Sequence, residues 1–420
     1  MKKRTFQKSI ALQSRFHEAI PGGAHTYAKG DDQFPEFCPP IIAKGLGSHV
    51  WDVDGNEYIE YGMGLRSVGL GHAYPPIIFA AYRQMQLGSN YSRPANIELK
   101  AAEKLLSLVP GADMVKFAKN GSDATTAAIK LARAHTGRKK VAICGDHPFF
   151  SVNDWFIGAT KINNGIPKEI SSLTLKFEFN NLASVQRLFD EYPNEIACFI
   201  MEPEKYQPVE LDFLFGLQKL CKKYGAVFIL DEMITGFRWH IGGAQTMYGI
   251  EPDLSTFGKA MGNGFAIAAL LGKKEIMELG GLRHDRERVF LLSTTHGAEN
   301  HSLAASLAVI EEYEKDQVID YFKYQGERLR KGIKQSIAEN HLEGYVDVIG
   351  HPACMVFSTK DQNKKPYSQT YRTLLLQELI KRGVIAPNLV ISFSHKDKDI
   401  DRTVEIFHEV LGIYRKAIDE

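Results

Sequence analysis

The chain has 420 residues, more than one hydrophobic core usually spans, so two or three domains are expected. With 44% hydrophobic and 24% charged residues, the composition excludes a disordered protein. A net charge of +1 gives no electrostatic reason to expect a nucleic acid or a membrane surface as partner.

The five cysteines are widely spaced and form no CxxC pair, which indicates reduced thiols and a cytoplasmic protein. The N-terminal sequence MKKRTFQKSIALQSRF lacks the apolar core of a secretion signal. No apolar run approaches the ~20 residues that a membrane-spanning helix needs.

The N-terminal part is predicted to contain a short amphipathic helix over residues 3–20, which ends at Pro21-Gly22-Gly23. An irregular stretch follows, and then Asp54-Gly55 between alternating apolar residues predicts a β-hairpin. Helical patterns begin at Ile77 and at Ile97.

Short apolar runs then alternate with helical segments. Strands are expected at residues 114–118, 140–144, 173–177, 197–201, 226–230 and 265–271, and helices at 182–192, 213–224 and 302–315. This alternation predicts a mostly parallel α/β sheet, in which ligands bind at the carboxyl ends of the strands. The remainder, with a further strand expected over residues 390–393, is typical of a smaller α+β domain. The expected domains are an N-terminal segment (1–60), a large domain (61–305) and a small C-terminal domain (306–420).

Asp231 directly follows the apolar run 226–230, and a second short apolar stretch ends at Lys259. An acid at a strand tip can hold a protonated pyridine nitrogen, and an amine in the same cavity can form an imine with an aldehyde. The alternative, two unrelated surface charges, is the better interpretation for either residue alone.

Three further strand ends carry polar groups. Asn120-Gly121-Ser122 precedes a helix and suits a phosphate, although Ser122 or Asp123 could simply cap that helix. His147 could stack on a ring or be an ordinary loop histidine. Glu202 is a carboxylate that could contact a cofactor or a neighbouring turn. The Ser293–Gly297 segment could bind phosphate or be only a polar turn.

Together these positions resemble the class III pyridoxal-phosphate aminotransferases, closest to the glutamate-1-semialdehyde 2,1-aminomutase group. The resemblance covers nearly the whole chain and is most specific in KNGSDATTAAIKLARAHTGRKK and in the segment from LDEMITGFR to GKAMGNG. It implies the aspartate aminotransferase fold, which is fold type I of these enzymes, a pyridoxal 5'-phosphate cofactor and a homodimer with shared active sites. No metal is expected.

The resemblance implies a role for each matching residue. Lys259 matches the Schiff-base lysine, and Asp231 matches the acid paired with the pyridine nitrogen. Gly121 and Ser122 match the phosphate turn, and Thr295 matches the threonine that reaches the phosphate in the neighbouring subunit. His147 stands where the family usually has a tyrosine over the ring.

The residues expected to bind the substrate depart from the aminomutase pattern. Lys29 replaces an arginine that binds the substrate carboxylate, Leu65 replaces a tryptophan, and a glutamate expected near Pro387 is missing. Arg66 and His296 are additional polar groups. We therefore assign Lys29, Arg66 and His296 to substrate binding.

These departures favour an aminotransferase that uses an amino-acid donor and a separate keto or aldehyde acceptor, first of all a sugar or sugar-acid derivative from polysaccharide biosynthesis. The alternatives are a true aminomutase and, less favoured, a non-catalytic protein with the same fold. A dinucleotide-binding oxidoreductase is disfavoured because no GxGxxG follows an early strand.

Overall fold

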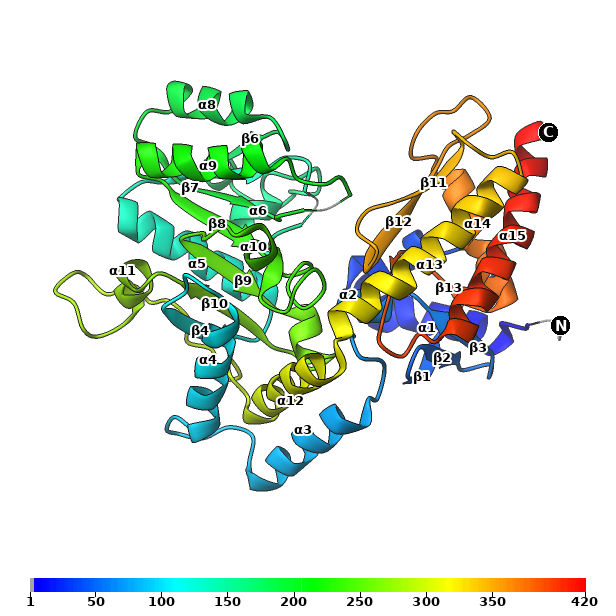
Figure 1. Ribbon diagram of the computed structural model, residues 1–420, viewed down its shortest axis with the longest axis horizontal. Coiled ribbons are helices and arrows are strands. Elements are labelled where there is room, and N and C mark those ends of the chain that lie inside the picture. Colours follow the sequence, from blue (N-terminus) through cyan, green and yellow to red (C-terminus); the bar gives the residue numbers. More distant parts are fainter. Residues whose placement is uncertain (1–3, 148, 205) are drawn as a thin grey trace. The chain divides into compact units, whose positions relative to one another are not determined.

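The computed structural model describes residues 4–147, 149–204 and 206–420, which form two compact units (Figure 1). The central unit is Pro75–Asp316. The terminal unit joins the chain up to Tyr74 with Gln317–Glu420. The domain boundaries expected after residues 60 and 305 stay a prediction.

A seven-stranded sheet organises the central unit, with the strand order β4-β10-β9-β8-β7-β5-β6. Its strands are β4 (Met114–Ala118), β5 (Lys140–Cys144), β6 (Thr174–Phe177), β7 (Ile196–Met201), β8 (Val227–Asp231), β9 (Leu254–Phe257) and β10 (Ala268–Gly272). Strands β6, β5, β7, β8 and β9 are parallel neighbours. Strand β10 runs antiparallel to both β9 and β4, so β4 points the same way as β9.

Helices cover both faces of this sheet. On one face, α5 (Gly121–Thr136) packs through alanines and Leu131 against Val141 and Ile143. On the other face, α8 (Leu182–Glu191) and α9 (Leu211–Tyr224) pack against Ala142 and Cys144. Because the central strands are buried on both faces, their sequences are continuously apolar rather than alternating.

The remaining helices of the central unit are shorter or lie outside these two layers. They are α3 (Pro75–Leu87), α4 (Asn96–Leu108), α6 (Asp154–Ile157), α7 (Lys168–Ser171), α10 (Gly243–Tyr248), α11 (Lys274–Met277) and α12 (Asn300–Asp316), with the 3-10 turns η4 (Lys259–Gly262) and η5 (Glu278–Gly280).

The terminal unit contains two small sheets and several helices. One sheet has the order β1-β2-β3-β13 and the other β11-β12-β14. Its strands are β1 (Ile42–Leu46), β2 (His49–Asp52), β3 (Glu57–Glu60), β11 (Val346–Ile349), β12 (Cys354–Thr359), β13 (Val384–Ile385) and β14 (Leu389–Val390). Its helices are α1 (Gln7–Ala19), α2 (Met63–Arg66), α13 (Val318–Glu339), α14 (Gln369–Arg382) and α15 (Asp397–Asp419), and its 3-10 turns are η1 (Pro21–Gly23), η2 (Tyr27–Lys29) and η3 (Asp31–Gln33).

The predicted mostly parallel α/β sheet is confirmed, and so is the hairpin at Asp54-Gly55, where β2 pairs antiparallel with β3. The strand expected over residues 390–393 is wrong in extent, because β14 ends at Val390. Among the described residues, no helix is long and apolar enough to cross a bilayer.

Candidate functional site

Five strand ends of the central sheet meet at one edge. The parallel direction of β4, β5, β7, β8 and β9 places the segments that follow them on the same side of the sheet. These segments carry Asn120, His147, Glu202, Asp231 and Lys259. Such an edge is where parallel α/β sheets bind ligands.

Asp231 is the last residue of β8 and is only 2% exposed. Its Oδ1 accepts hydrogen bonds from the Met233 backbone N–H (3.0 Å) and from Thr256 Oγ1 (3.1 Å). Burial raises the pKa of Asp231, and the charge of Lys259 acts in the opposite direction. A buried carboxylate of this kind favours a cationic partner.

Lys259 is half-buried and begins η4, directly after Gly258. Its φ of 48° lies in the left-handed region, which costs a non-glycine residue on the order of 1 kcal/mol and is common at functional sites. The structure places the predicted amine near enough to the predicted acid for the charge of Lys259 to lower the pKa of Asp231.

Two glycines allow the elements of this edge to approach closely. A Cβ at Gly121 would lie 3.0 Å from Met233 Sδ, and one at Gly258 would lie 2.7 Å from the same atom. Met233 therefore contacts the start of α5 and the residue before Lys259. A side chain at either glycine would force the buried Met233 side chain to move.

The start of α5 has features that suit an anion. Asn120 is the N-cap, and its Oδ1 accepts the Asp123 N–H at 3.0 Å, so Asn120 and not Ser122 or Asp123 caps the helix. Ser122 Oγ accepts the Val152 N–H at 3.0 Å. The first N–H groups of a helix have no carbonyl partner four residues earlier within the helix, and those that the cap does not use favour a phosphate together with the helix dipole.

His147 is 4% exposed and lies against the rings of Phe150 and Phe179, with centroids 6.0 and 5.2 Å away. Its Nδ1 accepts the backbone N–H of Glu202 at 3.0 Å. The structure therefore brings these two predicted residues together, and the contact comes from the Glu202 backbone.

Thr295 and His296 lie in an exposed loop before α12. The Thr295 carbonyl accepts a hydrogen bond from Asn90 Nδ2 (2.8 Å), and His296 Nδ1 pairs with Glu299 Oε1 at 3.1 Å. Glu299 also pairs with Lys119, the residue before the anion turn, and this hydrogen bond is the main cause of the lowered pKa of Glu299. Sequence reasoning missed Glu299, whose only signal is its position in the same polar loop.

Lys29 and Arg66 belong to the terminal unit. Lys29 is exposed at the end of η2. Arg66 is half-buried, and its Nε donates to Cys354 Sγ at 3.3 Å.

Glu232 was also missed, although it adjoins Asp231. This fully buried carboxylate accepts hydrogen bonds from the N–H groups of Ala244 (2.8 Å) and Gln245 (2.7 Å) and from the Thr235 hydroxyl. Burial raises its pKa to about 7 despite these three donors. Glu232 thus anchors the start of α10 to the end of β8.

Glu232→Gln is expected to lower the free energy of unfolding by about 2–4 kcal/mol at pH 8. The three partners of Glu232 are all hydrogen-bond donors, and the NH₂ group of the glutamine would face one of them without an acceptor. Thermal unfolding measures the effect. Glu314→Gln is the matched control, since its exposed pair with Lys104 contributes about 0–1 kcal/mol. Equal losses for both variants would contradict the role of Glu232.

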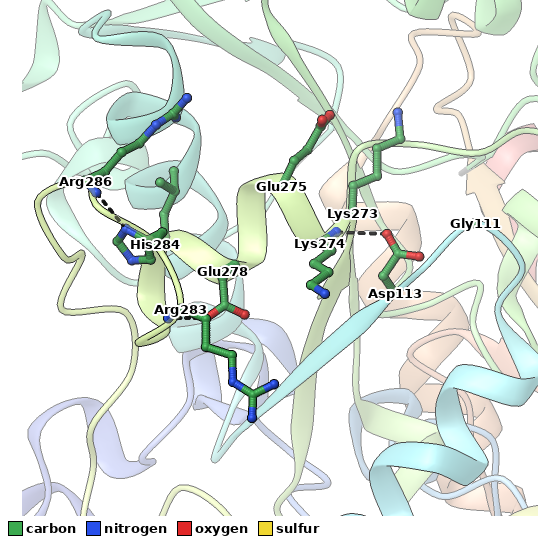
Figure 2. A pocket seen from close by; sticks show the side chains of 10 residues that line it. Gly111, Asp113, Lys273, Lys274, Glu275, Glu278, Arg283, His284 and Arg286 are labelled. Atoms are coloured by element: carbon green, nitrogen blue, oxygen red, sulfur yellow. Dashed lines mark hydrogen bonds between the residues drawn. The ribbon is translucent and has the colours of Figure 1, made fainter.

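A surface hollow of the central unit lies away from these residues. It has a volume of about 860 Å³ and is lined by charged side chains, including Lys274, Glu278, Arg283 and His284 (Figure 2). Asp113 and Lys273, which also line it, flank the start of β4 and the end of β10, at the sheet edge opposite Asp231. We therefore place no part of the candidate site there.

The residues at the Asp231 edge fit pyridoxal phosphate. The anion turn at Gly121-Ser122 suits its phosphate, the buried Asp231 carboxylate suits a protonated ring nitrogen, and the Lys259 amine suits its aldehyde. When bound, this group serves as an electron sink for the substrate carbon. The fold and this edge define a pyridoxal-phosphate enzyme of fold type I.

Comparison with known proteins identifies the family. The family model for class-III aminotransferases matches residues 27–411. The chain is 30% identical to a glutamate-1-semialdehyde 2,1-aminomutase of Desulforamulus reducens, with 96% of each chain covered. It is 30% identical to a 3-aminobutyryl-CoA aminotransferase of Cloacimonas acidaminovorans, with 99% of each covered. The chain therefore belongs to the class-III aminotransferases and is a pyridoxal-phosphate-dependent enzyme of the aminotransferase type.

A solved structure agrees with this assignment. The chain superposes on the PLP internal aldimine form of the FumI protein from Sphingopyxis sp. MTA144. The TM-score is 0.87 and the sequence identity is 26%. The alignment covers 98% of this chain and 96% of that one. The predicted aspartate aminotransferase-type fold is confirmed.

Proposed function

We propose that the enzyme transfers an amino group from an amino-acid donor to a separate keto or aldehyde acceptor, and that the acceptor is a sugar or sugar-acid derivative of polysaccharide biosynthesis. The observation that carries this proposal is Lys29 at the position where an aminomutase is expected to have an arginine. A lysine is a point charge and cannot bind a carboxylate through two parallel hydrogen bonds as an arginine does. Arg66 and His296 supply further polar groups for a hydroxylated acceptor.

In this proposal, Lys259 Nζ would hold the cofactor through its aldehyde and would serve as the base and acid that moves a proton at the donor carbon. Asp231 keeps the proton on the ring nitrogen. Gly121 and Ser122 would hold the phosphate, with Asn120 capping the helix at their turn, and His147 and Glu202 would lie next to the ring. Proton transfer by a positioned amine contributes on the order of 10²–10⁴-fold to such reactions.

The second candidate function is intramolecular amino transfer, as in an aminomutase. It is supported by the relative from Desulforamulus reducens, which bears that name. An aminomutase needs one substrate at steady state, whereas an aminotransferase needs two.

The two candidates differ in their need for an acceptor. We expect glutamate-1-semialdehyde alone to give no sustained turnover, and an amino-acid donor with a keto-sugar to give turnover that depends on both concentrations. Cofactor absorbance and product analysis measure this. Sustained conversion of glutamate-1-semialdehyde without a second substrate would establish the aminomutase instead.

We also propose a cytoplasmic homodimer with shared active sites. The five buried free thiols support a reducing compartment. Helix α3 exposes a row of large apolar side chains that suits a second copy of the chain, namely Ile78, Phe79, Tyr82, Met85 and Leu87. Thr295 is exposed, as a residue that serves a neighbouring subunit must be before assembly.

Mixing two inactive variants tests the shared sites. Lys259→Ala should inactivate its own site, and Thr295→Glu should repel the phosphate in its neighbour's site. Co-expressed hybrids should regain activity, because one of their two sites then has both native residues. Hybrids of Lys259→Ala with Asp231→Asn are the control and should stay inactive. Failure of the first pair to recover would contradict sharing through Thr295.

A further inference from the structure

A buried carboxylate in the loop after β7 has no role in the site described so far. Glu204 is 7% exposed, and its Oε2 accepts a hydrogen bond from the indole N–H of Trp239 at 3.0 Å. The Tyr248 hydroxyl donates to the same oxygen. Trp239 is 1% exposed, so this bond lies in the interior of the central unit.

The contacts of Glu204 join two strand ends of the sheet through α10. The start of α10 is held by Glu232, which follows β8 and adjoins Asp231. Tyr248, at the other end of α10, holds Glu204 in the loop after β7. The short helix α10 therefore links the end of β8, which carries Asp231, to the segment after β7, which carries Glu202.

The same loop determines the tautomer of His147. Glu202, two residues before Glu204, donates its backbone N–H to His147 Nδ1. A nitrogen that accepts a hydrogen bond carries no proton, so the neutral imidazole carries its proton on Nε2. A tyrosine or phenylalanine at this position would need no such partner.

We propose that Glu204 is a positioning residue, which holds the Glu202 N–H in place through Trp239 and Tyr248 and thereby sets the ring orientation and the Nε2–H tautomer of His147. The link to catalysis rests on the proposed function, in which His147 lies next to the cofactor ring. Glu204 itself touches no reacting atom. In this way, hydrogen bonds fix the orientation of the His147 ring.

Two variants of Glu204 separate positioning from charge. Glu204→Leu removes the oxygen that accepts from the Trp239 indole and the Tyr248 hydroxyl, whereas Glu204→Gln keeps an acceptor oxygen. We expect Glu204→Leu to weaken pyridoxal phosphate binding to the full-length enzyme by about 10-fold, and Glu204→Gln by less than about 3-fold. Glu210→Gln, an exposed position in the same loop, is the control and should bind normally.

Nitrogen NMR of the full-length protein with ¹⁵N-labelled histidine gives a readout that does not depend on turnover. In the wild type, the His147 signal, assigned by its absence in His147→Phe, should show an unprotonated Nδ1 and a protonated Nε2. Glu204→Leu should shift or broaden it. If Glu204→Leu fails to fold, Tyr248→Phe, which removes one donor, should cause a smaller shift of the same kind.

A double-mutant comparison tests whether Glu204 acts through His147. In the His147→Phe background, Glu204→Leu should change cofactor affinity by less than about 2-fold. An equal effect in both backgrounds, or a wild-type His147 protonated at Nδ1, would overturn the proposal. Failure of the wild type to bind pyridoxal phosphate would instead overturn the proposed function, while the NMR result on the protein alone would still decide the inference.

Discussion

Lys259→Ala is expected to abolish amino transfer, with a loss on the order of 10⁴-fold or more, because the variant lacks both the amine that holds the cofactor and the base that moves the proton. Borohydride reduction followed by peptide mass analysis should attach the cofactor to Lys259 in the wild type and to no residue in the variant. The half-buried position of Lys259 beside Asp231 carries this expectation.

The matched control is Lys273→Ala. Lys273 pairs with Asp253 at 2.5 Å, and Asp253 directly precedes β9, at the opposite edge of the sheet from Lys259. This control should keep its turnover and its labelling at Lys259. Retained amino transfer in Lys259→Ala would show that another residue performs both roles.

Asp231→Asn is expected to lower kcat by about 10²–10⁴-fold, the range associated with positioned charge stabilisation and proton transfer. The amide can still accept from Met233 and Thr256, so the fold should persist, but it cannot hold a proton on the ring nitrogen. Single-turnover absorbance changes measure the loss.

The two variants should differ in one respect. Borohydride labelling at Lys259 should survive in Asp231→Asn and disappear in Lys259→Ala, because Asp231 acts on the ring and not on the bond to the lysine. Asp113→Asn is the control, since this exposed acid lies at the opposite edge of the sheet. Wild-type kcat in Asp231→Asn would remove Asp231 from the proposed mechanism.

Local sequence was sufficient for most of the central sheet. Strands β4 and β5 match the expected ranges, because each is a short, mostly apolar segment bounded by turn residues, which is the pattern typical of a strand. Strand β1 was not predicted, since its residues are mostly exposed and show no alternation. The parallel pairing of β13 with β3 joins opposite ends of the chain, and no local pattern encodes it.

In the candidate site, too, local sequence predicts some residues, whereas others depend on contacts between distant segments. Asp231 and Lys259 could be proposed from the sequence, because each ends an apolar run and because the surrounding motifs resemble a known family. The contacts that support these two residues could not be proposed from the sequence. Met233 against Gly121 and Gly258, Glu232 under α10, and Glu299 beside Lys119 each depend on segments that meet only in the folded chain.

Local sequence accounts for which segments become strands and helices, and for the residue types at their ends. The convergence of these ends depends on how the strands pair in the folded chain. The antiparallel insertion of β10 turns β4 so that its anion turn lies at the same edge as Asp231 and Lys259. The physical reason is that strand order and direction arise from pairing between distant residues, whereas apolar periodicity reports only on neighbours along the chain.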